Sequence, residues 1–343
     1  FFKAKLLILD EPTTSLNNDE VEHLFQIIRN LKDKGTSFIF ISHKMPEIFQ
    51  IADRYTVLRN GEFVQTGKIS EITQEEMTDL MVGEKLSHQE IYQVREPGEN
   101  ILELDHLSGH GFFDVNLTVE KGSIVGLTGL QGSGSSELLQ GLFGAVPVIG
   151  GTLKLHGKDC KIRSIQGAMK AGIAMLASNR KENSVIPDMS ILENMYLSEQ
   201  VLSASHPFIS IEKERKRYER YKEMLSVKAE DPDDPITSLS GGNQQKVFLA
   251  RWLNTEADIL LLDNPTQGID VGAKAEIYKL ILKLAEAGKT ILINTLEIPE
   301  LAKVADRCAV FYEGTIIKML QHEEIDEKTV MLYSTNAAQR GVS

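Results

Sequence analysis

Apolar runs and amphipathic stretches alternate along the first part of the sequence. The runs at 6–9 and 38–41 have the length and continuity of buried strands. Between them, apolar residues recur every three or four positions, which predicts a helix with one buried face that ends near Gly35. We expect this stripe to be core and not a cofactor site. Its residues are Val21, Leu24, Phe25, Ile28 and Leu31.

A second series of elements begins near residue 101. An alternating stretch at 101–104 and an apolar one at 115–119 predict strands, and the run at 124–127 predicts a buried strand. From 191 to about 228 the pattern is helical and densely charged, which is typical of a solvent-exposed helix face. Strands that alternate with helices predict an α/β fold, with a mixed sheet flanked by helices and a helical insert around 190–240.

The two series contain copies of one pattern. Residues 6–61 align with 259–314 without a gap, at an offset of 253 (259 minus 6), so that Asp10 meets Asp263. The polar stretch at 87–100, broken by a Pro-Gly pair, predicts a linker. Because the chain begins inside an apolar run, we expect the first copy to be truncated at its N-terminus. The expected domains are the C-terminal part of the first copy at 1–86 and a second copy at 101–343.

Composition narrows the function. The 343 residues carry a formal net charge of −12, which argues against nucleic-acid binding, since a phosphate backbone is bound by an excess of Lys and Arg. No run reaches the roughly 18 apolar residues that cross a bilayer. Cys160 and Cys308 lack metal-ligand spacing, so we expect reduced thiols that simply pack, as in the cytosol.

A glycine loop follows the apolar run at 124–127. Its glycines let backbone N–H groups curl around phosphate oxygens, and the helix expected after it adds a favourable dipole. A P-loop carries Lys before its last hydroxyl residue, but here that residue is Ser135, while Ser136 keeps a hydroxyl that can bind Mg²⁺. The lost charged hydrogen bond is worth roughly 1.5–3 kcal/mol. The loop residues are Gly129, Leu130, Gln131, Gly132, Ser133, Gly134, Ser135 and Ser136.

Two further strings give the loop its context. Residues 239–245 read Leu-Ser-Gly-Gly-Asn-Gln-Gln ahead of a helix, and 259–266 form an apolar run followed by polar residues. In this order, the three strings resemble the P-loop, signature motif and Walker B strand of the ABC ATPase family. The resemblance implies a P-loop NTPase fold in which each ATP lies between the P-loop of one domain and the signature of the other. The signature residues expected at the phosphate are Ser240, Gly241, Gly242 and Gln244.

The resemblance and the repeat together assign roles in the first copy. Asp10 matches the Walker B carboxylate that holds Mg²⁺, Glu11 the base that polarises the attacking water, and His43 the switch histidine at the outer phosphate. Without the motif, an exposed strand-end pair of acids and a core histidine would be the simpler interpretation. With it, we expect this copy to supply the catalytic residues of one competent ATP site.

The second copy departs from the family pattern. Its Walker B carboxylate, Asp263, is kept, but Asn264 replaces the base and Leu296 replaces the switch histidine. An amide cannot take up a proton, and a leucine cannot hydrogen-bond a phosphate. Ser178 also stands where the family usually has a glutamine or glutamate that senses Mg²⁺ and the permease. We therefore expect a degenerate site that holds ATP and Mg²⁺, through Ser136 and Asp263, weakly or without turnover.

Two aromatic residues precede the strand that leads into the glycine loop. Phe112 and Phe113 stand where the family often has an aromatic ring that stacks on adenine. Packing in the core is an equally good interpretation of either residue.

The tandem layout, the signature at 239–245 and the Asp-Val-Gly-Ala-Lys string at 270–274 resemble the ATP-binding subunits of simple-sugar importers. This resemblance covers nearly the whole chain. It implies an ATPase that uses ATP and Mg²⁺ at the cytoplasmic face of the cell membrane, with integral membrane permease subunits and, indirectly, a solute-binding protein as partners. The tandem domains would pair with each other or with a second copy. We expect this chain alone to be inactive. The alternatives are a nucleoside importer, a non-hydrolysing regulatory module, and a soluble ABC protein of translation or DNA repair.

Overall fold

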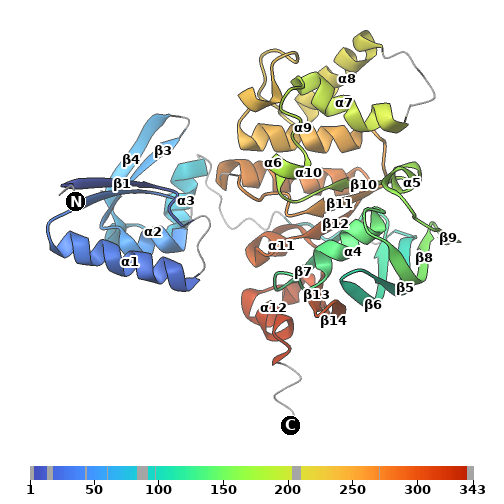
Figure 1. Cartoon of the computed structure of the whole chain (residues 1–343), viewed down its shortest axis with the longest axis horizontal. Helices are drawn as coiled ribbons and strands as arrows, with labels where there is room; N and C mark the ends of the chain where they lie inside the picture. Colours follow the sequence, from blue (N-terminus) through green and yellow to red (C-terminus); the bar gives the residue numbers. More distant parts are fainter. Residues whose placement is uncertain are drawn as a thin grey trace. The chain divides into compact units, whose positions relative to one another are not determined.

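The chain folds as two compact units, both drawn in Figure 1. This computed structural model describes residues 4–13, 18–42, 45–59, 61–82, 92–96, 98–202, 210–269 and 271–337. Unit 1 comprises residues 1–89 with 270–272, and unit 2 comprises 90–269 with 273–343. The main division therefore falls inside the polar stretch at 87–100. None of the described helices is both long and apolar enough to cross a membrane.

Unit 1 alternates strands with helices. Strands β1 and β2 pair in parallel, and β3 and β4 form an antiparallel hairpin. The predicted stripe of helix α1 faces inward, with Phe25 and Ile28 buried and the outer positions exposed. The elements are β1 Leu6–Asp10, α1 Asn18–Asp33, β2 Ser37–Ile41, α2 Met45–Ile51, β3 Arg54–Arg59, β4 Glu62–Lys68, the 3-10 turn η1 Ile69–Glu71 and α3 Gln74–Val82.

Unit 2 holds two sheets and most of the helices. A six-stranded sheet has the order β10-β11-β12-β7-β13-β14, and a four-stranded antiparallel sheet has the order β6-β5-β8-β9. The strands are β5 Asn100–Gly109, β6 Phe112–Glu120, β7 Ile124–Gly129, β8 Val148–Leu155, β9 Lys158–Asp159, β10 Ile173–Leu176, β11 Ile259–Asp263, β12 Thr290–Asn294, β13 Arg307–Tyr312 and β14 Thr315–Gln321.

The helices of unit 2 include the predicted insert, made of α7, α8 and the start of α9. All pairs in the six-stranded sheet are parallel except β13 with β14, so the predicted mixed sheet flanked by helices is confirmed (Figure 1). The helices are α4 Ser135–Leu142, α5 Ile165–Lys170, α6 Arg180–Asn183, α7 Ile191–Leu202, α8 Ile211–Met224, η2 Ile236–Ser238, α9 Gly241–Leu253, α10 Val271–Glu286, α11 Ile298–Val304, η3 His322–Glu324 and α12 Glu327–Ser334.

The six-stranded sheet of unit 2 is buried on both faces. Along β11, Leu260 and Leu262 pack into a cluster with helices α7, α9 and α10, whereas Ile259 and Leu261 pack into a second cluster with α4 and the antiparallel sheet. Because neighbouring side chains of a strand face opposite sides, a strand covered on both faces needs an unbroken apolar sequence. This explains the continuous run that ends at Asp263 and places its carboxylate at the carboxyl edge of the sheet.

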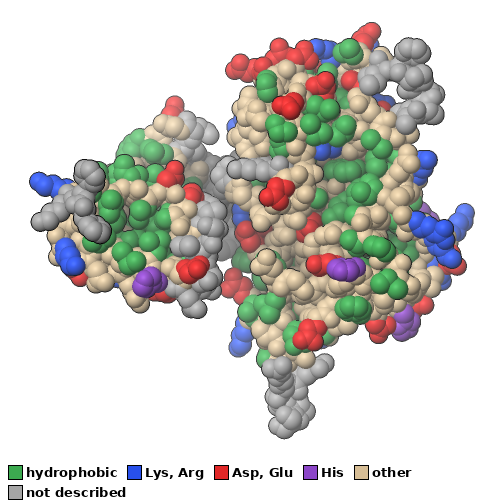
Figure 2. All heavy atoms as spheres, viewed as in Figure 1, with side chains coloured by type: hydrophobic (Ala, Val, Ile, Leu, Met, Phe, Trp, Pro, Cys, Tyr) green, Lys and Arg blue, Asp and Glu red, His purple; other side chains and the backbone are tan. Residues whose placement is uncertain are grey.

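Strand β2 is more exposed than its sequence predicts. Ile39 and Ile41 are each 46% exposed, whereas Leu292, which stands at the Ile39 position in the second copy, is fully buried. In unit 2, β12 lies between β11 and β7, but among the described residues of unit 1 β2 pairs only with β1. The prediction that 38–41 is a buried strand is therefore wrong for one of its faces. Figure 2 shows hydrophobic side chains gathered on the visible surface of unit 1.

The two copies share backbone geometry after their first strands. Glu11 and Asn264 both have a φ of 46°, which L-residues rarely adopt. Each donates its backbone N–H to the last residue of the neighbouring strand, to Ile41 O at 2.9 Å and to Asn294 O at 2.7 Å. The sharp turn that follows Asp10 is thus the same as the turn that follows Asp263.

Other details repeat at the same offset of 253. Thr13 Oγ1 donates to Glu47 Oε2 at 2.6 Å, and Thr266 Oγ1 donates to Glu300 Oε2 at 2.7 Å. The hairpins β3–β4 and β13–β14 each carry a β-bulge, at Val57/Leu58 and at Val310/Phe311. The repeat found in the sequence is a repeat of the fold.

Candidate functional site

The glycine loop of unit 2 joins β7 to α4 with its backbone tightly curled. Gly134 has a φ of 102°, and a Cβ there would lie 2.5 Å from Gly111 O. A Cβ on Gly129 would lie 2.5 Å from Phe311 O. Neither position has room for a larger residue. The first N–H groups of α4 have no partner inside the helix, and the helix start favours an anion, so the loop can hold phosphate.

Serines line this loop in place of a cation. Ser135, at the position expected to carry Lys, is buried and uncharged. Ser133 Oγ is also buried and has no hydrogen-bond partner among the described residues. A buried hydroxyl without a partner is costly, which suits a group that meets a ligand oxygen.

Ser136 and Asp263, which the sequence predicts to share a site, lie together. Ser136 Oγ donates to Asp263 Oδ2 at 2.6 Å. Asp263 is 1% exposed, and its other oxygen accepts from Asn264 Nδ2 at 3.1 Å and from Asn294 Nδ2 at 2.6 Å. Asn294 is not among the site residues predicted from the sequence. Its signal was present, since a polar residue ends an apolar strand at the position where the first copy has Ile41.

In unit 1, the structure describes two of the three predicted catalytic residues. Asp10 ends β1 and is exposed, and Glu11 follows it in the left-handed turn. His43 lies outside the described residues. Its counterpart in the second copy, Leu296, is 51% exposed and offers no polar atom from its side chain.

The signature segment begins helix α9. Ser240 is exposed and accepts at Oγ from Asn243 Nδ2 at 3.0 Å, while Gln244 Nε2 donates to Leu239 O at 3.0 Å. A Cβ on Gly242 would lie 2.6 Å from Ala273 Cβ, so this glycine allows α9 to approach α10. Gly241 is the first residue of the helix. The segment therefore presents the start of a long helix at the surface, as a phosphate contact requires.

A buried arginine ties the signature helix to the rest of the insert. Arg251 is 5% exposed and donates to Asn194 O, Ser184 O and Asn194 Oδ1 at 2.6, 2.9 and 2.9 Å. Asn194 Nδ2 in turn donates to the carbonyls of Ile186, Met189 and Ser190. Burial lowers the pKa of Arg251 to about 10. This network fixes the segment 184–190 against α9, and no motif in the sequence predicts it.

The loop around Ser178 contacts the segment that follows the Walker B strand. Ser178 O accepts from Asn183 Nδ2 at 2.7 Å, and the backbone N–H of Asn179 donates to Gln267 Oε1 at 3.3 Å. A hydrogen bond thus joins the two segments.

The two phenylalanines have different environments. Phe112 is fully buried, whereas Phe113 is 52% exposed. The backbone N–H of Phe113 donates to Gly314 O at 2.8 Å, and the N–H of Gly314 donates to Ser133 O at 2.8 Å. Phe112 is therefore core, whereas the Phe113 ring is exposed on a residue whose backbone is linked through Gly314 to the glycine loop.

Residues 92–96 of the polar stretch pack against unit 2. The Tyr92 ring stacks on His322 with ring centroids 3.4 Å apart. Arg95 donates to Asp306 Oδ1 at 2.8 Å and to Val304 O at 3.0 Å. Burial and the neighbouring Asp306 raise the pKa of Tyr92 to about 12. This part of the expected linker is therefore fixed to the second domain.

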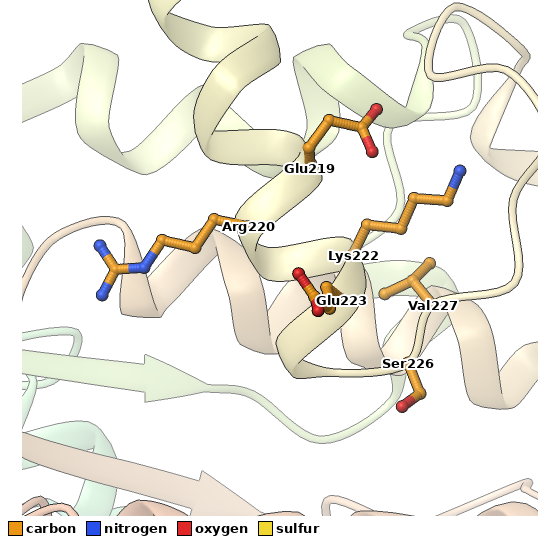
Figure 3. A pocket seen from close by; sticks show the side chains of 6 residues that line it. All are labelled: Glu219, Arg220, Lys222, Glu223, Ser226 and Val227. Carbon is orange, nitrogen blue, oxygen red and sulfur yellow. The ribbon is translucent and has the colours of Figure 1, made fainter.

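A hollow of about 510 Å³ lies at the end of α8. Figure 3 shows Glu219, Arg220 and Lys222 extending from the helix in different directions, with Ser226 and Val227 on the following turn. Charged groups of both signs that do not converge give no defined ligand site, so the hollow is not a candidate for nucleotide binding.

Comparison with known proteins identifies relatives over nearly the whole chain. The family described as ABC transporter matches residues 112–267. The ribose import ATP-binding protein RbsA of Halalkalibacterium halodurans is 41% identical over 333 residues, covering 97% of this chain and 67% of the relative. The D-allose import ATP-binding protein AlsA of Escherichia coli is 38% identical over 351 residues, with 96% and 67% covered.

Other relatives give the same picture. The arabinose import ATP-binding protein AraG of Mannheimia succiniciproducens is 41% identical over 331 residues, covering 96% of this chain and 66% of the relative. The chain spans about two thirds of the length of these relatives. Among solved structures, the ATP-binding cassette MJ1267 of an ABC transporter matches with a TM-score of 0.61 and 22% identity, over 70% of this chain and 99% of that one. At this identity the match shows the fold alone.

Proposed function

The chain belongs to the ABC transporter ATPase family, and on that premise we propose that it powers the import of a simple sugar. The observation that carries the proposal is the set of relatives named for ribose, arabinose and D-allose import, at 38–41% identity over 96–97% of the chain. The glycine loop, the strand that ends at Asp263 and the helix that begins at Gly241 support the proposal, since they match three motifs of such an ATPase in the expected order.

The proposed partners are integral membrane permease subunits and, through them, a solute-binding protein. An ATP-binding subunit moves a solute only by closing and opening against a membrane partner. The chain is accordingly proposed to work at the cytoplasmic face of the membrane, where ATP is available.

Hydrolysis is assigned to the residues of unit 1. Asp10 is exposed at the strand end and offers the carboxylate oxygens that Mg²⁺ prefers, so the residue fits a metal ligand. Glu11 is proposed to accept a proton from the attacking water, and His43 to contact the outer phosphate. Bound ATP with Mg²⁺ supplies the phosphoryl group that water receives. The pairing of these residues with the signature at Ser240–Gln244 stays a prediction.

Because this chain alone is expected to be inactive, the proposal is tested by uptake of labelled solutes into cells that express it as part of a protein extended upstream, together with its permease. Glu11→Gln removes the base and is expected to abolish uptake of a simple sugar. The matched control is Asn264→Glu at the equivalent position, which is expected to change uptake by less than about twofold. Loss of nucleoside uptake instead of sugar uptake would assign a nucleoside importer. Unchanged uptake in Glu11→Gln would contradict the hydrolytic role and favour a regulatory module.

A further inference from the structure

The carboxylate of Asp263 accepts three hydrogen bonds from neutral donors. Asn294 Nδ2 and Asn264 Nδ2 both donate to Oδ1, at 2.6 and 3.1 Å, and Ser136 Oγ donates to Oδ2 at 2.6 Å. An ionised carboxylate only accepts hydrogen bonds, so both amides must turn their nitrogens toward it. Asn294 does so even though its buried Oδ1 then has no partner among the described residues. The bond to Asp263 therefore decides the orientation of this side chain.

The internal repeat shows that the two amides are particular to unit 2. Asn264 and Asn294 stand at the positions that Glu11 and Ile41 occupy in the first copy. A glutamate carboxylate accepts hydrogen bonds but does not donate them, and the hydrocarbon side chain of isoleucine does neither. The backbone at the two places is the same, with equal φ at 11 and 264 and the same N–H bond to the neighbouring strand. The two asparagines thus add hydrogen-bond donors around Asp263 without a change in the backbone.

The remaining residues of unit 2 do not fit the magnesium site that the family implies. Mg²⁺ takes about six oxygen ligands at roughly 2.0–2.1 Å, and amide N–H groups cannot serve as ligands. Ser136, the second expected ligand, already donates to Asp263 and accepts from Gln140 Nε2 at 3.3 Å. Ser135 supplies no charge in place of the missing lysine. A metal ion bound through both oxygens of this buried carboxylate would have to displace Asn264 or Asn294 from Oδ1.

We propose that the glycine loop of unit 2 binds a nucleotide without a divalent cation, and that Asn264 and Asn294 stay hydrogen-bonded to Asp263 when the nucleotide is bound. The inference rests on the proposed function in one respect, that a nucleotide occupies this loop. The phosphate charge is met by backbone N–H groups at the start of α4 and by the buried Ser133 hydroxyl, which has no other partner in the described part of the chain. Such a nucleotide is held and not hydrolysed.

Equilibrium binding of ATP to residues 1–343, in Mg²⁺ and in EDTA, tests this inference. These residues contain one such glycine loop, so the assay on this segment reads a single phosphate site. The affinity of the wild-type protein is expected to differ by less than about twofold between the two conditions. The double variant Asn264→Glu/Asn294→Ile restores the residues of the first copy. It is expected to bind ATP about tenfold or more tightly in Mg²⁺ than in EDTA. Asn100→Glu, on an exposed strand end, is the charge-matched control.

Each possible result either supports or contradicts the inference. A wild-type ratio of about tenfold or more would overturn the inference and leave the proposed function standing. A wild-type ratio near one with no gain in the double variant would overturn the role of the two amides. The absence of ATP binding in both conditions would count against the inference and the proposed function together. The wild-type ratio is decisive even if the double variant fails to fold.

Discussion

Replacing Arg251 by methionine should weaken unit 2 substantially. The guanidinium makes three hydrogen bonds to neutral oxygens of Asn194 and Ser184. At about 1.5–3 kcal/mol for each charged bond, they contribute roughly 5–9 kcal/mol. Burial opposes them, since it lowers the pKa of Arg251 to about 10, an effect on the order of 3 kcal/mol. With part of the volume refilled by methionine, the net loss is expected to be about 3 kcal/mol.

The chain offers a direct probe of this loss. Trp252 is its single tryptophan, lies next to Arg251 and packs edge-on against Phe143 with ring centroids 5.4 Å apart. Urea denaturation followed by tryptophan fluorescence therefore reports the unfolding of unit 2. A loss of this size should also lower Tm by roughly 10 °C.

A surface arginine serves as the control. Arg215 pairs with Asp233 and its side chain is 46% exposed, so Arg215→Met should cost no more than about 1 kcal/mol. If Arg251→Met also stayed within about 1 kcal/mol of the wild type, the hydrogen bonds would merely balance the cost of burying the charge. The account of α9 as held in place by this residue would then be refuted.

Two further predictions concern the loop of unit 2 and its antiparallel sheet. Gly134→Ala should reduce the stability of unit 2 by about 3 kcal/mol and weaken ATP binding, because its Cβ would lie 2.5 Å from Gly111 O. Gly132→Ala is the control, because the space around its Cβ is open. It should cost only about 1 kcal/mol in the same fluorescence assay. The hydrogen bond that His106 Nδ1 donates to Asp114 Oδ1 raises the pKa of His106, so the NMR titration of His106 should move to lower pH in Asp114→Asn. The pair's stabilisation is present at pH below the unfolded pKa and fades as pH rises through the folded value.

The sequence predicts well those elements whose pattern of apolar residues can be seen along the chain itself. The continuous run before Asp263 and the stripe around Phe25 depend on periodicity along the chain, and both appear in the structure as expected. Adjacent residues of a strand face opposite sides, so one of Phe112 and Phe113 had to point inward. Which one did so depends on what covers each face, and the sequence alone does not tell.

The interactions that define the candidate site join residues far apart in the sequence, so the pattern of apolar residues does not predict them. Asn294 reaches Asp263 across 31 positions and Arg251 reaches Asn194 across 57, because neighbouring strands and helices bring them together. Resemblance to a family supplies roles only for motif residues, and these partners are outside the motifs. The exposure of Ile39 was missed for the same reason, since burial of a strand depends on its neighbours in the sheet.

The paired β-bulges at Val57/Leu58 and Val310/Phe311 bear on the history of the molecule. A bulge interrupts a ladder of hydrogen bonds and is a specific feature of a backbone. Finding it at corresponding positions in both copies, together with the shared turn at Glu11 and Asn264, points to one ancestral domain that was duplicated with its irregularities in place. The chemical divergence of the two units came afterwards, as a change of side chains on an inherited frame.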